Sequence, residues 1–263
     1  MRKQVLMQLV CTSTLLIGTA FAQAADSGGG SEHLRVADCQ ILNGPDLDRN
    51  TAKILQWIEV AVKRQVDVVS FPEACLPGYL PDGAYYERLG PDSVAAAEAR
   101  IAEASKCLDI AVVLGSVHWS NRELYNSLLA IDKGEIVRGR YAKTYLAENW
   151  STPGKSLPVL TLAGAKSCFI ICHDVRRPEL VRLPSIIGAQ IFYFCSHESS
   201  LTKEQKLSAY RAMPISRATE NTIFLVMANA AASPTDLGGS HGNSKSSVLT
   251  ATSWWKRRIS RSD

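Results

Sequence analysis

Three side chains that could share one reaction stand in this sequence where apolar runs end. Glu73 follows the run 66–72, Lys143 follows Tyr141-Ala142, and Cys172 follows Ile170-Ile171. Apolar, β-branched runs of this length are typical of buried strands, and sites often form where the strands of an α/β sheet end. A carboxylate, an ammonium and a thiol meeting there would supply a base, an oxyanion stabiliser and a nucleophile.

Each of these residues also has an ordinary interpretation when it is taken alone. Cys172 would be a core cysteine, Glu73 a solvated loop carboxylate, and Lys143 a solvated lysine. Cys172 stands out because the chain turns polar directly after it, where a partly exposed thiol near positive charge would favour the thiolate. A Glu73 carboxyl that is partly buried would have a pKa raised toward the range useful for proton transfer.

Strands alternate with helices along the chain, which favours a mixed sheet layered with helices. We expect helices at 48–64, 92–107, 178–187 and 203–219. We expect strands at 34–41, 66–71, 110–116, 123–131, 135–141, 167–172, 189–194 and 222–228. The segment 76–82 is predicted to be a loop because of its proline and glycine turn signals.

Composition favours one large α/β domain over two, since the 263 residues are 46% hydrophobic. The formal net charge of +4 equals the net charge of residues 243–263 alone, so the body of the chain is neutral and nucleic acid is not an expected partner. Cysteine spacing contains no Cys-x-x-Cys pair and predicts neither a zinc module nor a particular disulfide set.

The first residues predict a secretory signal peptide at 1–22, with a positive start at Arg2-Lys3 and small residues around Phe21. Residues 23–33 are predicted to be a flexible Gly/Ser linker, and 34–245 the catalytic domain. The protein is therefore expected to be exported, periplasmic or secreted, without a stable membrane span. Residues 246–263 form an atypical basic tail.

Three motifs together resemble the nitrilase superfamily of carbon–nitrogen hydrolases. They are Phe71-Pro72-Glu73-Ala74-Cys75-Leu76-Pro77-Gly78-Tyr79, Tyr141-Ala142-Lys143-Thr144-Tyr145-Leu146 and Cys172-His173-Asp174-Val175-Arg176-Arg177-Pro178-Glu179. A further segment, Arg217-Ala218-Thr219-Glu220-Asn221, is similar to a fourth part of that family. The resemblance covers about 34–245 and keeps the order of the motifs.

The resemblance implies a four-layer α-β-β-α sandwich that is often a homodimer. The atypical tail predicts that the sandwich is incomplete at the C-terminus. The resemblance implies Glu73, Lys143 and Cys172 as the catalytic triad, with Glu148 as a supporting second glutamate. It also implies an enzyme that needs neither a metal nor an organic cofactor. The Asp-x-Arg sequence after His173 looks like the amidase and carbamoylase branch. Three positions in these motifs differ from the family's usual residues: Arg177, His173 and Tyr145. These differences concern the substrate class more than the type of reaction.

The predicted function is therefore hydrolysis of a small amide or N-carbamoyl substrate to an acid and ammonia or an amine. Cys172 would form a thioester, Glu73 would move the protons, and the Lys143 ammonium and the backbone N–H of His173 would hold the oxyanion. Hydrolysis of a nitrile by the same triad is the alternative reaction.

Other protein classes fit the residues less well. A Cys–His hydrolase needs a histidine at the thiol, and neighbouring side chains such as Cys172 and His173 point apart in extended chain. Consecutive residues 172–174 cannot converge on one metal ion. A non-catalytic binding protein or pseudoenzyme is the rival from another class, because 246–263 lacks the turn and strand with which the family usually continues.

Overall fold

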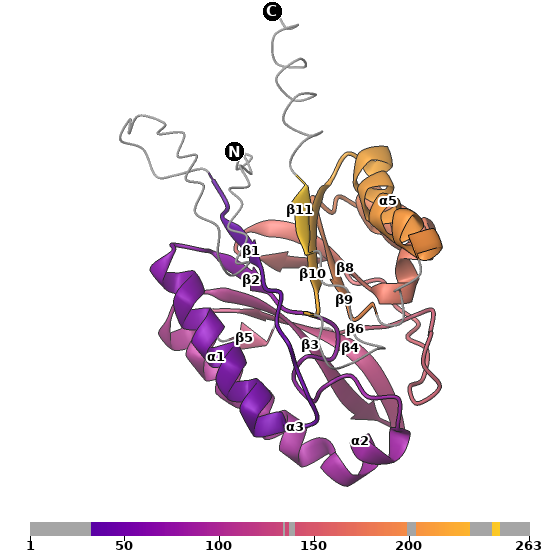
Figure 1. Cartoon of the computed structure of the whole chain (residues 1–263). Helices are drawn as coiled ribbons and strands as arrows, with labels where there is room; N and C mark the ends of the chain where they lie inside the picture. The colour runs from indigo at the N-terminus through magenta and orange to yellow at the C-terminus, as the bar shows by residue number, and fades with distance from the viewer. Residues whose placement is uncertain (1–32, 134, 137–139, 199–203, 232–243, 248–263) are drawn as a thin grey trace, which may run out of the picture.

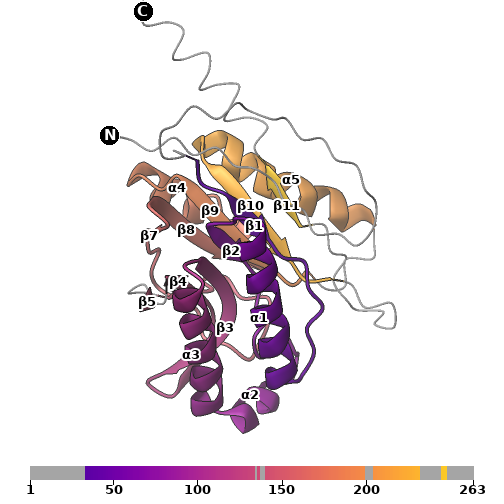
Figure 2. The same ribbon diagram turned by 90° about the vertical axis from the view of Figure 1, so that its left-hand side faces the viewer.

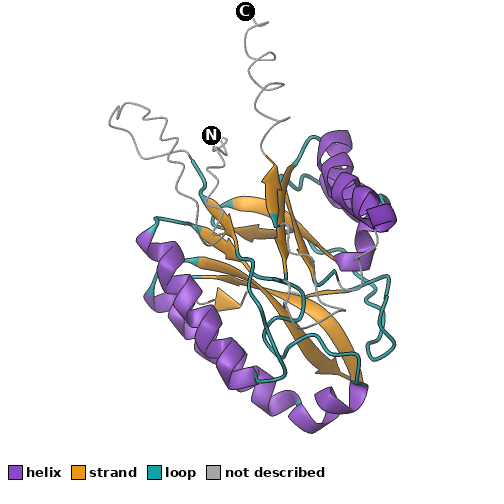
Figure 3. Ribbon diagram, in the orientation of Figure 1, coloured by secondary structure: helices purple, strands orange, loops and turns teal. Residues whose placement is uncertain are grey.

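Two β-sheets packed face to face, with helices on their outer faces, make up this protein in its computed structural model (Figures 1 and 3). The structure describes residues 33–133, 135–136, 140–198, 204–231 and 244–247. The predicted signal peptide 1–22 and linker 23–33 lie outside the described residues except for His33, and the predicted tail does so from residue 248 onward.

The first sheet has six strands and carries two of the three candidate residues at its strand ends. Its path runs β1-β2-β3-β4-β5, with β6 also paired to β4. The pairs β1–β2 and β2–β3 are parallel, and the pairs that β4 makes are antiparallel. The strands are β1 Val36–Asp38, β2 Val68–Ser70, β3 Ala111–Ser120, β4 Glu123–Asp132, β5 Glu135–Ile136 and β6 Tyr141–Ala142.

The second sheet has five strands and carries the candidate nucleophile. Its order is β11-β10-β9-β8-β7, with β8, β9 and β10 parallel to one another and the two outer strands antiparallel. The strands are β7 Leu160–Leu162, β8 Ala165–Ile171, β9 Ile191–Ser196, β10 Phe224–Asn229 and β11 Lys245–Ser247.

Helices cover the outer face of each sheet, as the turned view in Figure 2 also shows. The helices are α1 Leu47–Lys63, α2 Gly83–Leu89, α3 Pro91–Cys107, α4 Glu179–Ile186 and α5 Glu204–Asn221, with a 3₁₀ turn, η1, at Cys172–Arg176. Asp46 begins α1 by accepting the N–H of Arg49 at 3.0 Å, which satisfies one of the free donors of the first turn.

Three apolar layers alternate with the sheets and helices. Along β8, Phe169 and Ile171 pack between the two sheets, whereas Cys168 and Ile170 pack under α4 and α5. The first sheet divides in the same way, since Val113 faces the other sheet and Val112 faces α1 and α3. Successive strand residues point to opposite faces, so strands buried on both faces are apolar throughout. The predicted α-β-β-α sandwich is confirmed.

The elements differ from the prediction in several places. The helix α2 and the strands β7 and β11 were not predicted, and β11 extends to Ser247, inside the predicted tail 246–263. The strand β3 continues to Ser120, four residues beyond the predicted end, because it pairs with β4 along its full length. The chain after Ile171 forms η1 instead of a loop, and the predicted second strand of the 123–141 hairpin is described only at its two ends.

Among the described residues, no helix combines the length and apolarity that a membrane crossing needs. The six cysteines in this part of the chain are all free thiols: Cys39, Cys75, Cys107, Cys168, Cys172 and Cys195.

Candidate active site

The three predicted residues come from strand ends in both sheets and meet at one end of the layer between them. Glu73 follows β2 and Lys143 follows β6, both in the first sheet, whereas Cys172 follows β8 in the second. Tyr141 and Ile171, which precede Lys143 and Cys172, both belong to the apolar layer between the sheets. The site therefore depends on the packing of one sheet on the other.

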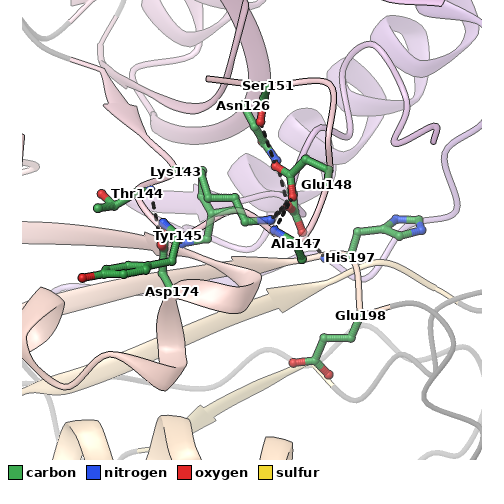
Figure 4. Close-up of polar contacts among 12 residues, drawn as sticks. Asn126, Lys143, Thr144, Tyr145, Ala147, Glu148, Ser151, Asp174, His197 and Glu198 are labelled. Carbon is green, nitrogen blue, oxygen red and sulfur yellow. Dashed lines mark hydrogen bonds and ion pairs between the residues drawn. The ribbon is translucent and has the colours of Figure 1, made fainter. Parts of the chain in front are cut away.

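Lys143 is the centre of a fully buried ionic cluster. Its ammonium donates to Glu73 Oε1 at 2.8 Å and to Glu148 Oε2 at 2.6 Å. The side chains of Lys143 and Glu73 are 0% exposed and that of Glu148 is 2% exposed. Figure 4 shows Lys143 reaching toward Glu148, with Asn126 beside them. A buried charge is tolerated when it is paired and hydrogen-bonded, and both conditions hold here.

Neutral donors complete the shell around the two carboxylates. The side-chain amide of Asn126 donates to Glu73 Oε1 and to Glu148 Oε1, each at 2.8 Å. The backbone N–H of His197, directly after β9, donates to Glu73 Oε2 at 2.8 Å. Glu148 also accepts from the Ser151 hydroxyl at 3.1 Å and the Ala147 N–H at 3.1 Å.

The two carboxyl groups have pKa values shifted in opposite directions. Burial raises the pKa of Glu73, and the nearby Lys143 ammonium offsets only part of that effect. Burial also acts to raise the pKa of Glu148, but the Lys143 ammonium and the hydrogen bonds from Lys143 and Asn126 outweigh it, so this pKa is lowered. Opposed shifts of neighbouring carboxyls are how a site separates a proton carrier from a fixed charge.

Lys143 itself stays charged. Burial acts to lower its pKa, but the neighbouring carboxylates, Glu73 first and then Glu148, outweigh burial and raise that pKa well above its ordinary value. A permanent cation at this point can stabilise negative charge that forms during a reaction.

Cys172 is half-buried at a strained turn from strand to helix. Its φ of +41° lies in the left-handed region, where a residue with a side chain is strained by about 1–3 kcal/mol. Such turns present a side chain at the end of a strand, as in the nucleophile elbow of α/β-hydrolases.

The thiol of Cys172 is protonated in the resting protein, contrary to the expectation that positive charge there would favour the thiolate. Burial, followed by the charge of Glu73, raises its pKa, and the Lys143 ammonium only partly compensates. A thiol in this state needs a base when it attacks.

Asp174 ties the lysine loop to the cysteine turn. Its buried carboxylate accepts the Tyr141 hydroxyl at 2.6 Å and the N–H of Tyr145 at 2.8 Å, on either side of Lys143. It also accepts the N–H of Ile171 at 3.0 Å, next to Cys172. One side chain thereby holds both catalytic candidates in register.

Two of the candidate histidines, His118 and His197, each stack on a tyrosine ring. The His197 ring stacks on Tyr79 with centroids 4.8 Å apart, and in Figure 4 it points away from the Lys143 cluster. The His118 ring stacks on Tyr125, and burial lowers the pKa of His118 to about 4. Within the described residues, no group of three His, Cys, Asp or Glu side chains is arranged to hold a metal ion.

Aromatic rings line one side of the cluster. Tyr79 stacks on His197 and meets Trp150 edge-on at 6.0 Å, and Trp150 stacks on Tyr86 at 4.2 Å. Burial and the charges of Glu73 and Glu148 raise the pKa of Tyr79, so its hydroxyl stays neutral beside the carboxylates.

The sequence reasoning missed Asn126, the N–H of His197 and the linking role of Asp174. Asn126 carried a usable signal, because it and Ser127 are the two polar residues inside the run 124–131 of β4, and a buried amide needs partners. The His197 contact carried none, since any residue supplies a backbone N–H.

A comparison with protein families matches residues 35–253 to the carbon–nitrogen hydrolase model. The chain belongs to the carbon–nitrogen hydrolase family. Among its curated relatives, the "Hydrolase in agr operon" of Staphylococcus aureus is 27% identical over 194 residues, which are 70% of this chain and 72% of the relative. The 2-oxoglutaramate amidase of Bacillus subtilis is 29% identical over 180 residues, which are 66% and 67% of the two chains.

Solved structures share the carbon–nitrogen hydrolase fold. A double mutant of the amidase from Nesterenkonia sp. AN1, in complex with acrylamide, has a TM-score of 0.74 at 23% identity and covers 84% of this chain and 85% of that one. Another structure of that amidase carries the acetamide moiety of fluoroacetamide on its active-site cysteine, with a TM-score of 0.70, 23% identity and 79% of each chain covered.

Proposed function

We propose that this carbon–nitrogen hydrolase cleaves the C–N bond of a small amide or N-carbamoyl substrate through a thioester on Cys172. The observation that carries the proposal is the buried Glu73–Lys143–Glu148 cluster, whose Glu73 and Lys143 charges both act on the Cys172 thiol. The amidase names among its relatives support an amide over a nitrile.

In the first half of the reaction, Glu73 takes the thiol proton as Cys172 Sγ bonds to the carbonyl carbon. The electron pair of the C=O bond moves to oxygen, and the oxyanion is held by the Lys143 ammonium and the backbone N–H of His173. The first N–H groups of a helical turn have no partner within it, which suits the N–H at the second position of η1 for this role.

The second half releases the products. The oxyanion collapses, the C–N bond breaks, and Glu73 returns its proton to the departing ammonia or amine. Glu73 then takes a proton from water as the water oxygen attacks the thioester, and Cys172 leaves with that proton as a thiol. The division of roles follows the pKa values: Glu73, whose pKa is raised, carries the proton, and Glu148 stays ionised beside Lys143.

The test is ammonia release from a panel of simple amides, N-carbamoyl compounds and nitriles, with Cys172→Ala beside the parent. We expect the variant to lose at least a 1000-fold factor in kcat/KM, because the covalent step is removed. Cys168→Ala is the matched control, since this buried thiol lies on β8, the strand that leads to Cys172, but packs under α4 and α5.

Each contrary outcome has a definite meaning. Cys172→Ala with the parent rate would exclude the thioester route. A folded parent protein that releases no ammonia from any substrate would support the non-catalytic rival. Faster turnover of nitriles than of amides would assign the alternative reaction.

Two further proposals concern the whole protein. We propose export after removal of residues 1–22, because the sequence has a signal-peptide pattern. N-terminal sequencing of the protein from cell fractions tests this.

We also propose a homodimer, which is consistent with the exposed Leu183, Ile186 and Ile187 at the end of α4 and just beyond it. Light scattering across a dilution series tests it, and the exclusion of nucleic acid stays a prediction from charge.

A further inference from the structure

The ionic cluster holds two carboxylates but one ammonium. Among the described residues, Lys143 is the cation that forms ion pairs with Glu73 and Glu148. Two buried carboxylates beside a single cation favour protonation of one of them, because like charges in a low-dielectric site repel. Glu73 must nevertheless be ionised to take a proton, so the site needs a further source of positive charge.

Asn126 is neutral, but the N–H groups of its side-chain amide supply partial positive charge to both carboxylates. Its Nδ2 lies 2.8 Å from one oxygen of each carboxylate, so both of its N–H groups are used. The chemistry fixes the orientation of the amide, since the opposite orientation would point the carbonyl oxygen at two anions. Each N–H presents a partial positive charge to an ionised partner, which makes a stronger hydrogen bond than one between neutral groups.

Asn126 is also built into a rigid element. It lies in β4, and its backbone carbonyl accepts the N–H of Lys143 at 2.8 Å. The side chains of Asn126 and Lys143 are therefore carried by paired backbone on adjacent strands. Because strand pairing fixes the backbone of Asn126, its amide can hold the two carboxylates at a constant separation.

We propose that Asn126 is a positioning residue. It keeps the Glu73 carboxylate ionised and fixes its orientation while Glu148 pairs with Lys143. The proposal rests on the proposed function, because it gives Glu73 the role of base. Asn126 acts through the carboxylates and does not touch the reacting atoms. It differs from a structural asparagine in that its removal should change the pH at which Glu73 works.

The charged and titratable groups that face Glu73 come from several elements. Lys143 and Glu148 follow β6, Cys172 begins η1, and Tyr79 lies in the loop after β2. Tyr86 of α2 and Cys195 of β9 also face it. The N–H of His197 comes from the end of β9. All of these remain when Asn126 is replaced, so a change in the pH profile is assigned to the amide.

The test compares Asn126→Leu and Asn126→Asp with the parent. Leucine has a similar volume and no donor, and aspartate has the same shape but at most one donor, so neither can bridge both carboxylates. Two profiles are measured against pH: kcat/KM for the best amide, and the rate at which iodoacetamide alkylates Cys172, followed by mass spectrometry of its peptide.

We expect the midpoint of the acid limb to move up by about one pH unit or more in both profiles, because a hydrogen bond to an ionised group is lost. At the parent's midpoint this corresponds to a roughly fivefold lower rate. Ser127→Ala is the matched control: this buried serine is the next residue of β4, its side chain points to the opposite face of the strand, and its hydroxyl has no hydrogen-bond partner among the described residues, so its midpoint should equal that of the parent.

A structural role alone would lower the rate by the same factor at every pH and leave the midpoint unchanged. Midpoints within about 0.3 of the parent's in a folded variant would overturn the proposal. If the leucine variant does not fold, as judged by near-UV circular dichroism, Asn126→Ala decides, because alanine also lacks the donor and adds no charge beside the two carboxylates. If Glu73→Gln retains the parent's acid limb and rate, the proposed function fails and Asn126 is not at issue.

Discussion

At the residue scale, the site gives two similar carboxyl groups pKa values shifted in opposite directions. Glu148 accepts four hydrogen bonds, including those from Lys143 and Ser151, and its pKa is lowered despite burial. Glu73 accepts three, and burial still raises its pKa. The difference in donors, together with the depth of burial, supports the proposed roles of Glu73 as proton carrier and Glu148 as permanent anion.

The stability of the protein should depend on Glu148 in a pH-dependent way. Its folded-state pKa is lowered, so its ionised form stabilises the fold above its ordinary pKa of about 4.5, and this contribution is lost as the pH falls through the folded-state value. Glu148→Gln should therefore lower the free energy of unfolding by about 2 kcal/mol at pH 7, and by less below pH 4.

Urea unfolding at a series of pH values measures this difference. Glu179→Gln, at the exposed start of α4, is the control and should change stability by less than about 0.5 kcal/mol. A constant difference between parent and Glu148→Gln from pH 7 down to pH 3 would contradict the assignment.

At the element scale, close backbone packing aims the side chains of the site. The turn that follows β2 lies directly on Gly115 of β3. A Cβ added to Gly115 would lie 1.8 Å from the carbonyl oxygen of Pro72 and 2.7 Å from the nitrogen of Ala74. Gly154 plays the same part for the lysine, since its Cβ would be 2.2 Å from the carbonyl oxygen of Ala142. Glycine at these two positions lets the turns carrying Glu73 and Lys143 approach their neighbours.

Gly115→Ala should displace the Glu73 turn. A displacement of about 1 Å at a catalytic group costs about 100-fold in rate, and overpacking costs about 1–3 kcal/mol in stability. The measurements are kcat/KM for an amide and thermal unfolding. Gly44→Ala is the control, because its Cβ would have no neighbour within 4 Å. Equal activity in the two variants would show that the turn does not need this close approach.

At the scale of the whole molecule, the active site exists only because two sheets are packed together. Glu73, Asn126 and Lys143 belong to one sheet, and Cys172 and His197 to the other. The layer between the sheets contains aromatic rings such as Phe169 and Tyr193, which stack at 5.8 Å. This layer sets the separation at which the two halves of the site face each other.

Phe169→Ala should therefore weaken the molecule as a whole. Removing a buried phenylalanine costs about 3–5 kcal/mol in the free energy of unfolding. Leu42→Ala, at a side chain that is 46% exposed, should change it by less than about 0.5 kcal/mol. Chemical denaturation compares the two, and a cost below about 1 kcal/mol for Phe169→Ala would mean that the layer collapses around the gap.

Sequence patterns predicted much of the element order because the local signals were strong. The apolar run before Glu73 corresponds to β2, and the predicted helix 48–64 corresponds to α1. Short elements escaped detection: α2 has seven residues and β7 has three, too few to show a period. The end of β3 was misjudged because its pairing with β4 continues past the apolar residues.

By itself, the sequence determined which residues carry reactive groups, and its motif order indicated the family and its layered fold. Only the tertiary structure decided which sheet each strand joins, which face of β8 meets the other sheet, and that Asn126 lies between two glutamates. The physical reason is that strands buried on both faces are apolar at every position, so their pattern does not reveal their neighbours. The contacts that tune Glu73 and Glu148 join residues up to 124 positions apart, and such contacts arise only when the sheets pack.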